Sequence, residues 1–217
     1  SDLGETILIV GGEDRPGHRT PLVCELRRRP ATLPVVALES DEDFQTDLWI
    51  SGEGGYQTYR IPALIAASNG EILAFCEGRR NSASDSGDID LLLRRSSDGG
   101  RTWTASQVVL DTGANTAGNP CPVVDRQTGR IWLSLTQNRG DDTEKQIVAG
   151  TAHGTRSVWV MFSDDHGRTW SEPRDITSAV KRSDWTWYAT GPGVGIQLHS
   201  GRLLIPCDFM EIGRAHV

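Results

Sequence analysis

The sequence feature that most constrains the fold is a turn signature that occurs twice, as SSDGGRTW at 96–103 and as SDDHGRTW at 163–170. In each copy an aspartate, Asp98 or Asp165, can accept backbone N–H groups within the turn. The glycine of the signature permits a positive φ angle, and the closing tryptophan can pack the turn onto a sheet. Because the signature is repeated, we interpret both aspartates as structural residues and not as catalytic ones.

Apolar segments separated by turn residues surround each copy of the signature. The clearest hairpin is the one turned by Ser68-Asn69-Gly70, because Asn-Gly between two apolar runs is a strong short-range signal. A third strand precedes each signature and a fourth follows it, so the pattern predicts a four-stranded antiparallel unit that repeats. The predicted strands are 60–67, 71–77, 89–95 and 107–110, then 121–125, 130–136, 157–163 and 172–176, and finally 194–198 and 202–206.

Repetition of four-stranded units is typical of a β-propeller, so the sequence predicts an all-β fold. The pattern amounts to about two and a half blades, which predicts an incomplete propeller domain over 47–210. Residues 1–46 are an unassigned N-terminal segment, with Thr6–Val10 and Val35–Leu38 as candidate strands. The last residues, 211–217 (EIGRAHV), lack strand alternation and match a translated sequencing-adapter read, so we expect them to be a non-native tail.

Charge and cysteine spacing exclude several classes of function. The net charge of −7 argues against nucleic acid as a partner, and an anionic ligand would need a local arginine site. No apolar run is long enough to span a membrane. The cysteines Cys24, Cys76, Cys121 and Cys207 are scattered singly, without the CxxC spacing of zinc or redox sites. We therefore predict neither a metal nor a cofactor.

Four short motifs occur in order around the turn signatures: YRIP at 59–62, LAFCEGR at 73–79, NPCP at 119–122 and GPGVGIQL at 191–198. Together they resemble the exo-α-sialidase (neuraminidase) family with Asp-box, or BNR, repeats, over about residues 48–210. The resemblance implies a six-bladed β-propeller with the site at the centre of one face. It also implies retaining hydrolysis of terminal sialic acid from a sialylated glycan: a sialoglycoprotein, an oligosaccharide or a ganglioside.

The resemblance assigns catalytic roles to Arg60 and Asp85. Sialic acid carries a carboxylate on its anomeric carbon, and arginine can hold a carboxylate through two parallel hydrogen bonds. Arg60, in the RIP motif, resembles the first of three such arginines in the family. Asp85 lies in the polar loop 81–87, where the family has the aspartate that protonates the leaving oxygen and then deprotonates water. Asp88 and Asp90 are rivals for this role, and capping a turn is the alternative role of Asp85.

Glu77, Arg79 and Asn119 resemble substrate-binding positions of the family. Arg79 resembles an arginine that lines the pocket near the sugar, and Glu77 resembles a partner that orients charge. A purely structural ion pair between the two is the alternative. Asn119 resembles a residue that contacts the substituents of the sugar, whereas an asparagine that starts a turn is the alternative.

The remaining catalytic groups of the family do not match this chain. Sialidases use a tyrosine nucleophile, activated by a glutamate, because an anionic nucleophile would be repelled by the carboxylate of the substrate. Tyr56, Tyr59 and Tyr188 do not match the place of that tyrosine, so we expect the nucleophile and two further arginines outside this chain. Trp187, Tyr188 and Asp208 are candidates for the pocket rim, with core packing as the alternative for Trp187.

Two other functions use the same residues and stay open. A non-catalytic propeller that binds glycans or proteins would also carry Asp-box turns, and a trans-sialidase would share Arg60 and Asp85. The sequence does not show the compartment; we expect an exported protein, extracellular or periplasmic, with a cytoplasmic or lysosomal one as the alternative. As a fragment, the chain is expected to be inactive on its own.

Overall fold

The computed structural model describes residues 13–15, 18–19 and 45–211. The chain divides into two units, 1–46 and 47–217. In the first unit the described residues form β1 (Glu13–Arg15) and β2 (His18–Arg19), which pair antiparallel. The two strands predicted for this unit lie outside the described residues. Of the predicted tail 211–217, only Glu211 is described, and it ends strand β14 (Cys207–Glu211).

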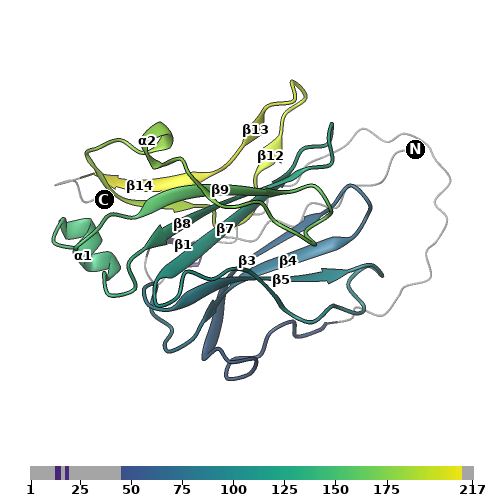
Figure 1. The fold of residues 1–217 in the computed structure, drawn as a ribbon, viewed down its shortest axis with the longest axis horizontal. Helices are drawn as coiled ribbons and strands as arrows, with labels where there is room; N and C mark the ends of the chain where they lie inside the picture. Colours follow the sequence, from purple (N-terminus) through teal and green to yellow (C-terminus); the bar gives the residue numbers. More distant parts are fainter. Residues whose placement is uncertain (1–12, 16–17, 20–44, 212–217) are drawn as a thin grey trace. The chain divides into compact units, whose positions relative to one another are not determined.

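Four antiparallel strands open the second unit and correspond to the first predicted repeat (Figure 1). They are β3 (Thr58–Ala66), β4 (Ile72–Arg79), β5 (Ile89–Ser96) and β6 (Gln107–Leu110). Each strand pairs with the next one in the sequence. Gly70, in the turn between β3 and β4, has a φ of 86°, which glycine adopts without a Cβ clash. The hairpin predicted from Asn69-Gly70 is therefore confirmed.

The second predicted repeat is confirmed as another set of four antiparallel strands. They are β7 (Thr116–Val124), β8 (Ile131–Asn138), β9 (Ser157–Ser163) and β10 (Arg174–Asp175). A single parallel pair, Ile89 with Thr116, joins β5 to β7, so the two repeats form one eight-stranded sheet. This sheet is mostly antiparallel, and within the described residues it is open at both ends.

A third group of strands is shorter. β11 (Trp185–Thr190) pairs with β14 (Cys207–Glu211), and β12 (Ile196–Gln197) pairs with β13 (Leu203–Leu204). The predicted hairpin of 194–198 with 202–206 is present with two residues in each strand. β11 is not predicted from the sequence, because five of its six residues are buried in succession and the polar alternation of a half-exposed strand is absent.

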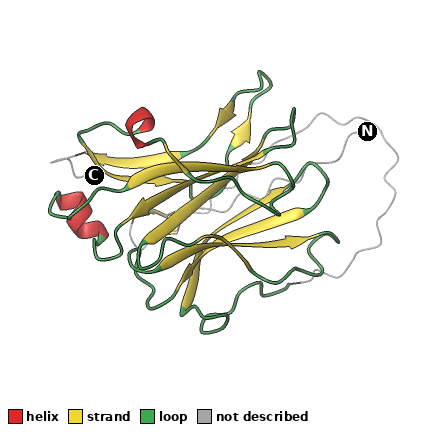
Figure 2. Ribbon diagram, in the orientation of Figure 1, coloured by secondary structure: helices red, strands yellow, loops and turns green. Residues whose placement is uncertain are grey.

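Two short helices, α1 (Glu144–Ala149) and α2 (Thr177–Val180), interrupt the strands (Figure 2). Neither is predicted, because helices of this length show no periodicity. α1 does carry a local signal: Thr143 and Gln146 form a capping box, in which each side chain bonds the backbone N–H of the other residue. The all-β fold class is confirmed, with helices only in the connections.

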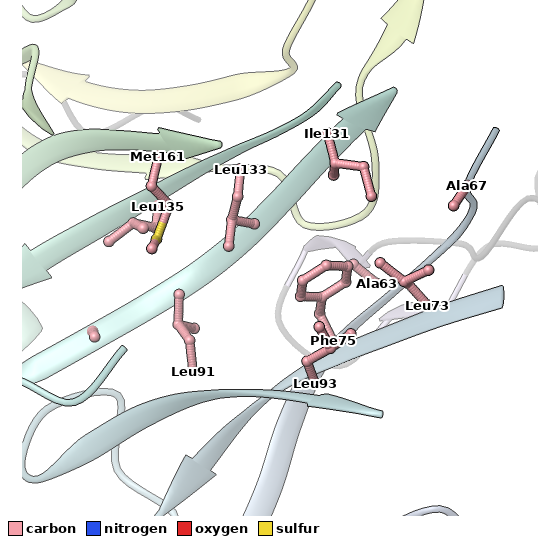
Figure 3. Close-up of a cluster of buried hydrophobic side chains, with 11 residues drawn as sticks. Ala63, Ala67, Leu73, Phe75, Leu91, Leu93, Ile131, Leu133, Leu135 and Met161 are labelled. Atoms are coloured by element: carbon pink, nitrogen blue, oxygen red, sulfur yellow. The ribbon is translucent and has the colours of Figure 1, made fainter. Parts of the chain in front are cut away.

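The core of the second unit lies between strands of the first two repeats (Figure 3). Leu73, Phe75 and Leu91 from the first repeat and Leu133 from the second are fully buried. Burying one such side chain contributes about 1.5–3 kcal/mol relative to leaving it exposed. Trp170, from the second turn signature, packs edge-on against Phe75 with ring centroids 5.9 Å apart. Trp170 of the second signature thus also packs the second repeat against the first.

Both turn signatures fold as predicted. The Asp98 carboxylate accepts the Thr102 backbone N–H at 2.9 Å and its hydroxyl at 2.6 Å, and these bonds lower the pKa of Asp98 to about 2. Asp165 accepts the same two groups of Thr169 at 2.8 and 2.6 Å. Burial raises the pKa of Asp165, but the bonds from Thr169 outweigh it and bring the pKa to about 2. The interpretation of both aspartates as structural residues is confirmed.

Each of the three strand groups has, in a strand or directly after one, a residue with positive φ that precedes a proline. These residues are Ile61 (φ 55°), Asn119 (φ 54°) and Gly191 (φ 77°). The pairing register of β3 and of β7 shifts at the first two. A β-branched residue in this region is strained by about 1–3 kcal/mol and signals a constraint imposed by its surroundings. Asn119 lies inside β7, which starts at Thr116 and not at Cys121 as predicted, so the turn-starting alternative is wrong.

The described cysteines, Cys76, Cys121 and Cys207, are free thiols, and Cys24 lies outside the described residues. Burial raises the pKa of Cys76 and raises that of Cys121 to about 12, so both side chains remain protonated at neutral pH. In the described part of the chain, no helix has the length and apolar character needed to cross a membrane.

Candidate active site

A carboxylate held between two arginines marks the candidate active site. Arg60 lies in β3 next to the strained Ile61, and Asp85 lies in the loop that follows β4. Asp85 Oδ1 accepts hydrogen bonds from Arg60 Nη1 at 2.9 Å and from Arg79 Nη2 at 2.7 Å. The side chains of Arg60 and Asp85 are 46% and 43% exposed, so a ligand can reach both. The structure therefore brings together the two residues expected to be catalytic.

Arg79, at the end of β4, anchors the loop that carries Asp85. Its side chain is 2% exposed, and its Nη1 donates to the carbonyl oxygens of Ala83 at 2.6 Å and Ser84 at 2.8 Å. Its Nε and Nη2 donate to Glu77 Oε2 at 2.9 and 2.5 Å. A buried ion pair is favourable only when its remaining hydrogen-bonding groups are satisfied, and the loop carbonyls and Asp85 do this here. The pair of Glu77 and Arg79 thus has a structural role, which is to hold the loop.

Asn119 connects this cluster to the other strand groups. Its backbone N–H donates to Glu77 Oε1 at 2.8 Å, and its carbonyl accepts the Thr190 hydroxyl at 2.7 Å. Its side-chain Oδ1 accepts from the Thr136 hydroxyl at 3.1 Å and from Arg156. One residue with an unusual backbone conformation therefore receives contacts from β4, β8, β11 and the residue that precedes β9.

A buried arginine, Arg156, completes the cluster, although the sequence analysis does not single it out. Its side chain is 2% exposed, its Nη1 donates to Asn138 Oδ1 at 2.7 Å, and its guanidinium lies 4.1 Å from the ring centroid of Trp187. Burial lowers the pKa of Arg156 to about 10, and surrounding carboxylates, led by Glu77, limit the shift. The one available signal was an arginine directly before the apolar run of β9, SVWVMFS.

These contacts form one continuous chain of hydrogen bonds, which we call the polar network. Its members are Arg60, Asp85, Arg79, Glu77, Asn119 and Arg156. The end at Arg60 and Asp85 is open to solvent, and the end at Arg156 is buried. The open end offers cationic donors for an anion next to a carboxyl group that can exchange a proton, while the buried end holds these groups in place.

A cavity of about 630 Å³ opens beside Asp85 and is large enough for a small-molecule ligand. Its walls include the loop 84–86, residues of α1 and Met210. Glu144, in the first turn of α1, lines the cavity, and burial together with the negative charge of Asp85 raises the pKa of Glu144. Glu144 is not predicted from the sequence, because it lies in α1, which is too short to show helical periodicity.

The rival aspartates Asp88 and Asp90 belong to a separate cluster around Arg80. Asp90, in β5, is fully buried, and its Oδ2 accepts from the Tyr56 hydroxyl at 2.6 Å and from Arg80 Nη2 at 2.7 Å. Asp88 Oδ1 accepts from Arg80 Nε at 3.1 Å. Neither carboxylate lines the cavity beside Asp85, and Asp90 is fully buried, which favours Asp85 as the acid/base candidate.

The three residues considered for the pocket rim differ in their surroundings. Trp187 is buried under the guanidinium of Arg156, as the core-packing alternative expects. Tyr188 is buried in β11, whereas Asp208 is exposed in β14. None of the three lines the cavity beside Asp85 as far as the described residues define it.

One group in the described part of the chain has metal-type ligands: Asp141, Asp142 and His153, whose ligand atoms lie within 4.8 Å of one another. The Asp142 carboxylate already accepts the backbone N–H groups of His153 and Gly154, each at 2.9 Å. Asp141 is paired with Arg139 at 2.7 Å. These hydrogen bonds and this ion pair hold the three residues together and join the two loops that carry them, so their proximity is explained without a cation.

Comparison with known protein sequences agrees with the motifs. Residues 70–216 match the family model of the BNR repeat-like domain. An exo-alpha-sialidase of Arthroderma benhamiae is 38% identical over 173 residues, which are 73% of this chain and 42% of that protein. Sialidase-3 of Mus musculus is 41% identical over 167 residues, which are 72% of this chain and 39% of that protein. The chain therefore spans about two fifths of the length of these two curated relatives.

Solved structures of sialidases have the same fold. The Hadza microbial sialidase Hz136 superposes with a TM-score of 0.67 and 31% identity over 74% of this chain and 34% of that chain. A leech intramolecular trans-sialidase superposes with a TM-score of 0.64 and 16% identity over 79% of this chain and 43% of that chain, a likeness of fold alone. The motifs, the family model and these relatives agree, and the chain belongs to the exo-α-sialidase family with BNR repeats.

Proposed function

We propose that the parent protein is a retaining exo-α-sialidase, which releases terminal sialic acid from sialoglycoproteins, oligosaccharides or gangliosides. The observation that carries the proposal is the Asp85 carboxylate between Arg60 and Arg79. Hydrolysis of a carboxylated glycoside requires a cation for the carboxylate and an acid for the leaving oxygen. The open end of the polar network supplies both: Arg60 is the cation and Asp85 is the acid, and their side chains lie within hydrogen-bonding distance of each other.

In the proposed reaction, Arg60 binds the carboxylate of the substrate. Its half-exposed guanidinium gives one N–H to Asp85 at 2.9 Å, and the rest of the planar fork can face an anion. The substrate carboxylate would therefore compete with Asp85 for Arg60. Binding of substrate releases Asp85 from one of its two arginine partners, and the carboxyl group can then turn toward the leaving oxygen.

In its protonated form, Asp85 would give its proton to the glycosidic oxygen as the bond to the sugar breaks, and the resulting carboxylate would take a proton from the incoming water, which restores the acid. The loop that carries Asp85 keeps its position through the bonds of Arg79 to the carbonyl oxygens of Ala83 and Ser84. Glu77 orients Arg79, and Asn119 would contact the substituents of the sugar.

The tyrosine nucleophile, its glutamate, two further arginines and the remaining blades of a six-bladed propeller would come from parts of the parent protein other than this chain. The chain has three tyrosines. Burial raises the pKa of Tyr56, Tyr59 and Tyr188. A nucleophilic tyrosine needs a neighbouring base that promotes its ionisation, which is the opposite effect. The tyrosines of this chain therefore do not suit the role.

The proposal is tested by expressing the full-length protein and measuring release of sialic acid from a sialylated oligosaccharide. NMR of the sugar just after cleavage should show the α-anomer first, as retention requires. A second assay with an acceptor sugar distinguishes a hydrolase from a trans-sialidase by the product. Glycan binding without turnover would identify a binding propeller, and neither binding nor turnover would contradict the proposal altogether.

A further inference from the structure

We infer that Arg156 is a positioning residue, which fixes the side-chain amide of Asn119 so that this residue can act only as a hydrogen-bond donor toward the sugar. The inference rests on the proposed function. The resemblance to the family assigns no role to Arg156, but its contacts in the polar network do.

The orientation of the Asn119 amide follows from the chemistry of its neighbour. A guanidinium group can only donate hydrogen bonds, so the asparagine atom that Arg156 Nη2 contacts is the oxygen, Oδ1. The Thr136 hydroxyl donates to the same oxygen at 3.1 Å. An asparagine amide could otherwise turn over and exchange its oxygen and nitrogen. Because the buried Arg156 stays charged, with a pKa of about 10, this exchange is prevented at neutral pH.

With Oδ1 occupied, one hydrogen-bonding group of Asn119 is left for a ligand. The backbone N–H is used by Glu77 and the carbonyl by Thr190. Nδ2 has no hydrogen-bond partner among the described residues, and Asn119 is partly exposed. Nδ2 would therefore recognise an acceptor oxygen, a hydroxyl or a carbonyl, on a substituent of the sugar.

Arg156 can fix the Asn119 amide because several contacts fix Arg156 itself. Its Nη1 donates to Asn138 at 2.7 Å, and its guanidinium lies 4.1 Å from the Trp187 ring centroid. Its backbone carbonyl accepts from Lys181 Nζ at 2.7 Å, and the same ammonium donates to the carbonyl of Thr186 at 2.9 Å. Contacts from β8, β11 and the end of α2 thus hold both the side chain and the backbone of Arg156.

The inference is tested with a double-mutant cycle in the full-length protein, formed by Arg156→Met, Asn119→Ala and the double variant. The readouts are KM and kcat on a sialoside with a fluorescent leaving group, the Kd for sialic acid and the melting temperature. Each single variant should raise KM and Kd about tenfold, the scale of one lost hydrogen bond, with kcat within about threefold. The double variant should show no larger increase in KM and Kd than either single variant.

A matched control is Arg130→Met. Arg130 is likewise stacked on an aromatic ring, 3.9 Å from the centroid of Phe162, and it is paired with Asp164, but it lies outside the polar network. This variant should leave KM unchanged. The inference would be overturned by a double variant whose increase in KM is the product of the two single increases. It would also be overturned by an Arg156→Met variant that has a lower melting temperature but an unchanged KM.

If Arg156→Met does not fold, Asn119→Asp gives the answer. Aspartate keeps an oxygen for Arg156 and strengthens that contact by its charge, but it has no amide donor. We expect a higher melting temperature together with a higher KM, and failure of either change would overturn the inference. A wild-type protein that binds sialic acid without turnover contradicts the proposed hydrolase alone, and Kd then replaces KM. Absence of both binding and turnover contradicts both proposals.

Discussion

At the residue scale, the site uses two arginines with different degrees of burial on one carboxylate. Arg79 is 2% exposed and binds the loop carbonyls as well as Asp85, whereas Arg60 is 46% exposed. The buried guanidinium cannot leave without exposing an uncompensated charge on Glu77. The exposed one can exchange Asp85 for an external anion at little cost, since both partners stay solvated. The same residue type thus provides a fixed anchor and an exchangeable binding group.

Replacing Asp85 with asparagine should remove the proposed acid. For a substrate with a sugar leaving group we expect kcat/KM of the full-length protein to fall by about 10²–10⁴, the usual contribution of general acid–base catalysis. A nitrophenyl sialoside, whose leaving group needs no proton, should lose less. Asp164→Asn, which breaks the exposed pair with Arg130, is the control and should leave both rates unchanged. Equal losses on the two substrates would argue against an acid role.

The same Asp85→Asn variant should bind free sialic acid more tightly. In the wild type, Asp85 occupies Arg60 and its negative charge repels the sugar carboxylate, so its removal frees a cation and removes a like charge. Titration calorimetry should show a Kd lower by about threefold or more. Weaker binding by this variant would contradict the proposed exchange of partners on Arg60.

Glu77→Ala should destabilise the protein far more than removal of a surface partner. Breaking a buried ion pair from one side typically costs about 3–5 kcal/mol, because the remaining charge on Arg79 stays buried. Glu71→Ala, which removes a partner of the exposed Arg168, should cost about 0–1 kcal/mol. Urea unfolding of both variants measures the difference, and similar losses would show that the Glu77–Arg79 pair is not energetically special.

At the element scale, strands with local signals could be predicted and those without could not. The hairpin at Asn69-Gly70 and the two turn signatures carry their information within a few residues, and the structure has them where the sequence predicts them. β7 begins earlier than predicted, because Asn119-Pro120 reads as a turn while the surrounding structure holds it inside a strand as a bulge. β11 has no alternation, since it is buried on both faces.

The first turn signature should make stability depend on pH in the acid range. The bonds from Thr102 lower the pKa of Asp98 to about 2, against an unfolded value of about 3.9. A lowered folded-state pKa means that the stabilisation is present above about pH 4 and is lost as the pH falls to about 2. The gap in urea midpoint between the wild type and Asp98→Asn should therefore narrow from pH 5 to pH 2. A gap that stays constant over this range would contradict the role of the carboxylate.

At the scale of the whole molecule, the candidate site was only partly readable from the sequence. Arg60, Glu77, Arg79 and Asp85 lie close together in the chain and carry recognisable motifs. Arg156 reaches the network only because the fold brings β7, β8 and β9 together, and no local pattern reports this. The approach is close: a Cβ atom on Gly118 would lie 2.6 Å from Glu77 Oε1, so a larger residue there would displace the Glu77 carboxylate.

The 217-residue chain alone should hydrolyse no sialoside, although it contains Arg60 and Asp85. Retaining cleavage needs a nucleophile as well as an acid, and burial raises the pKa of each of the three tyrosines. Tyr56 is further bound to the buried Asp90 at 2.6 Å, which keeps its hydroxyl from any substrate. The measurement compares the purified chain with the full-length protein on a fluorescent sialoside at equal concentration. Turnover by the chain that disappears in its Asp85→Asn variant would show that a nucleophile lies within these residues, and would refute the proposal that the parent protein supplies it from elsewhere.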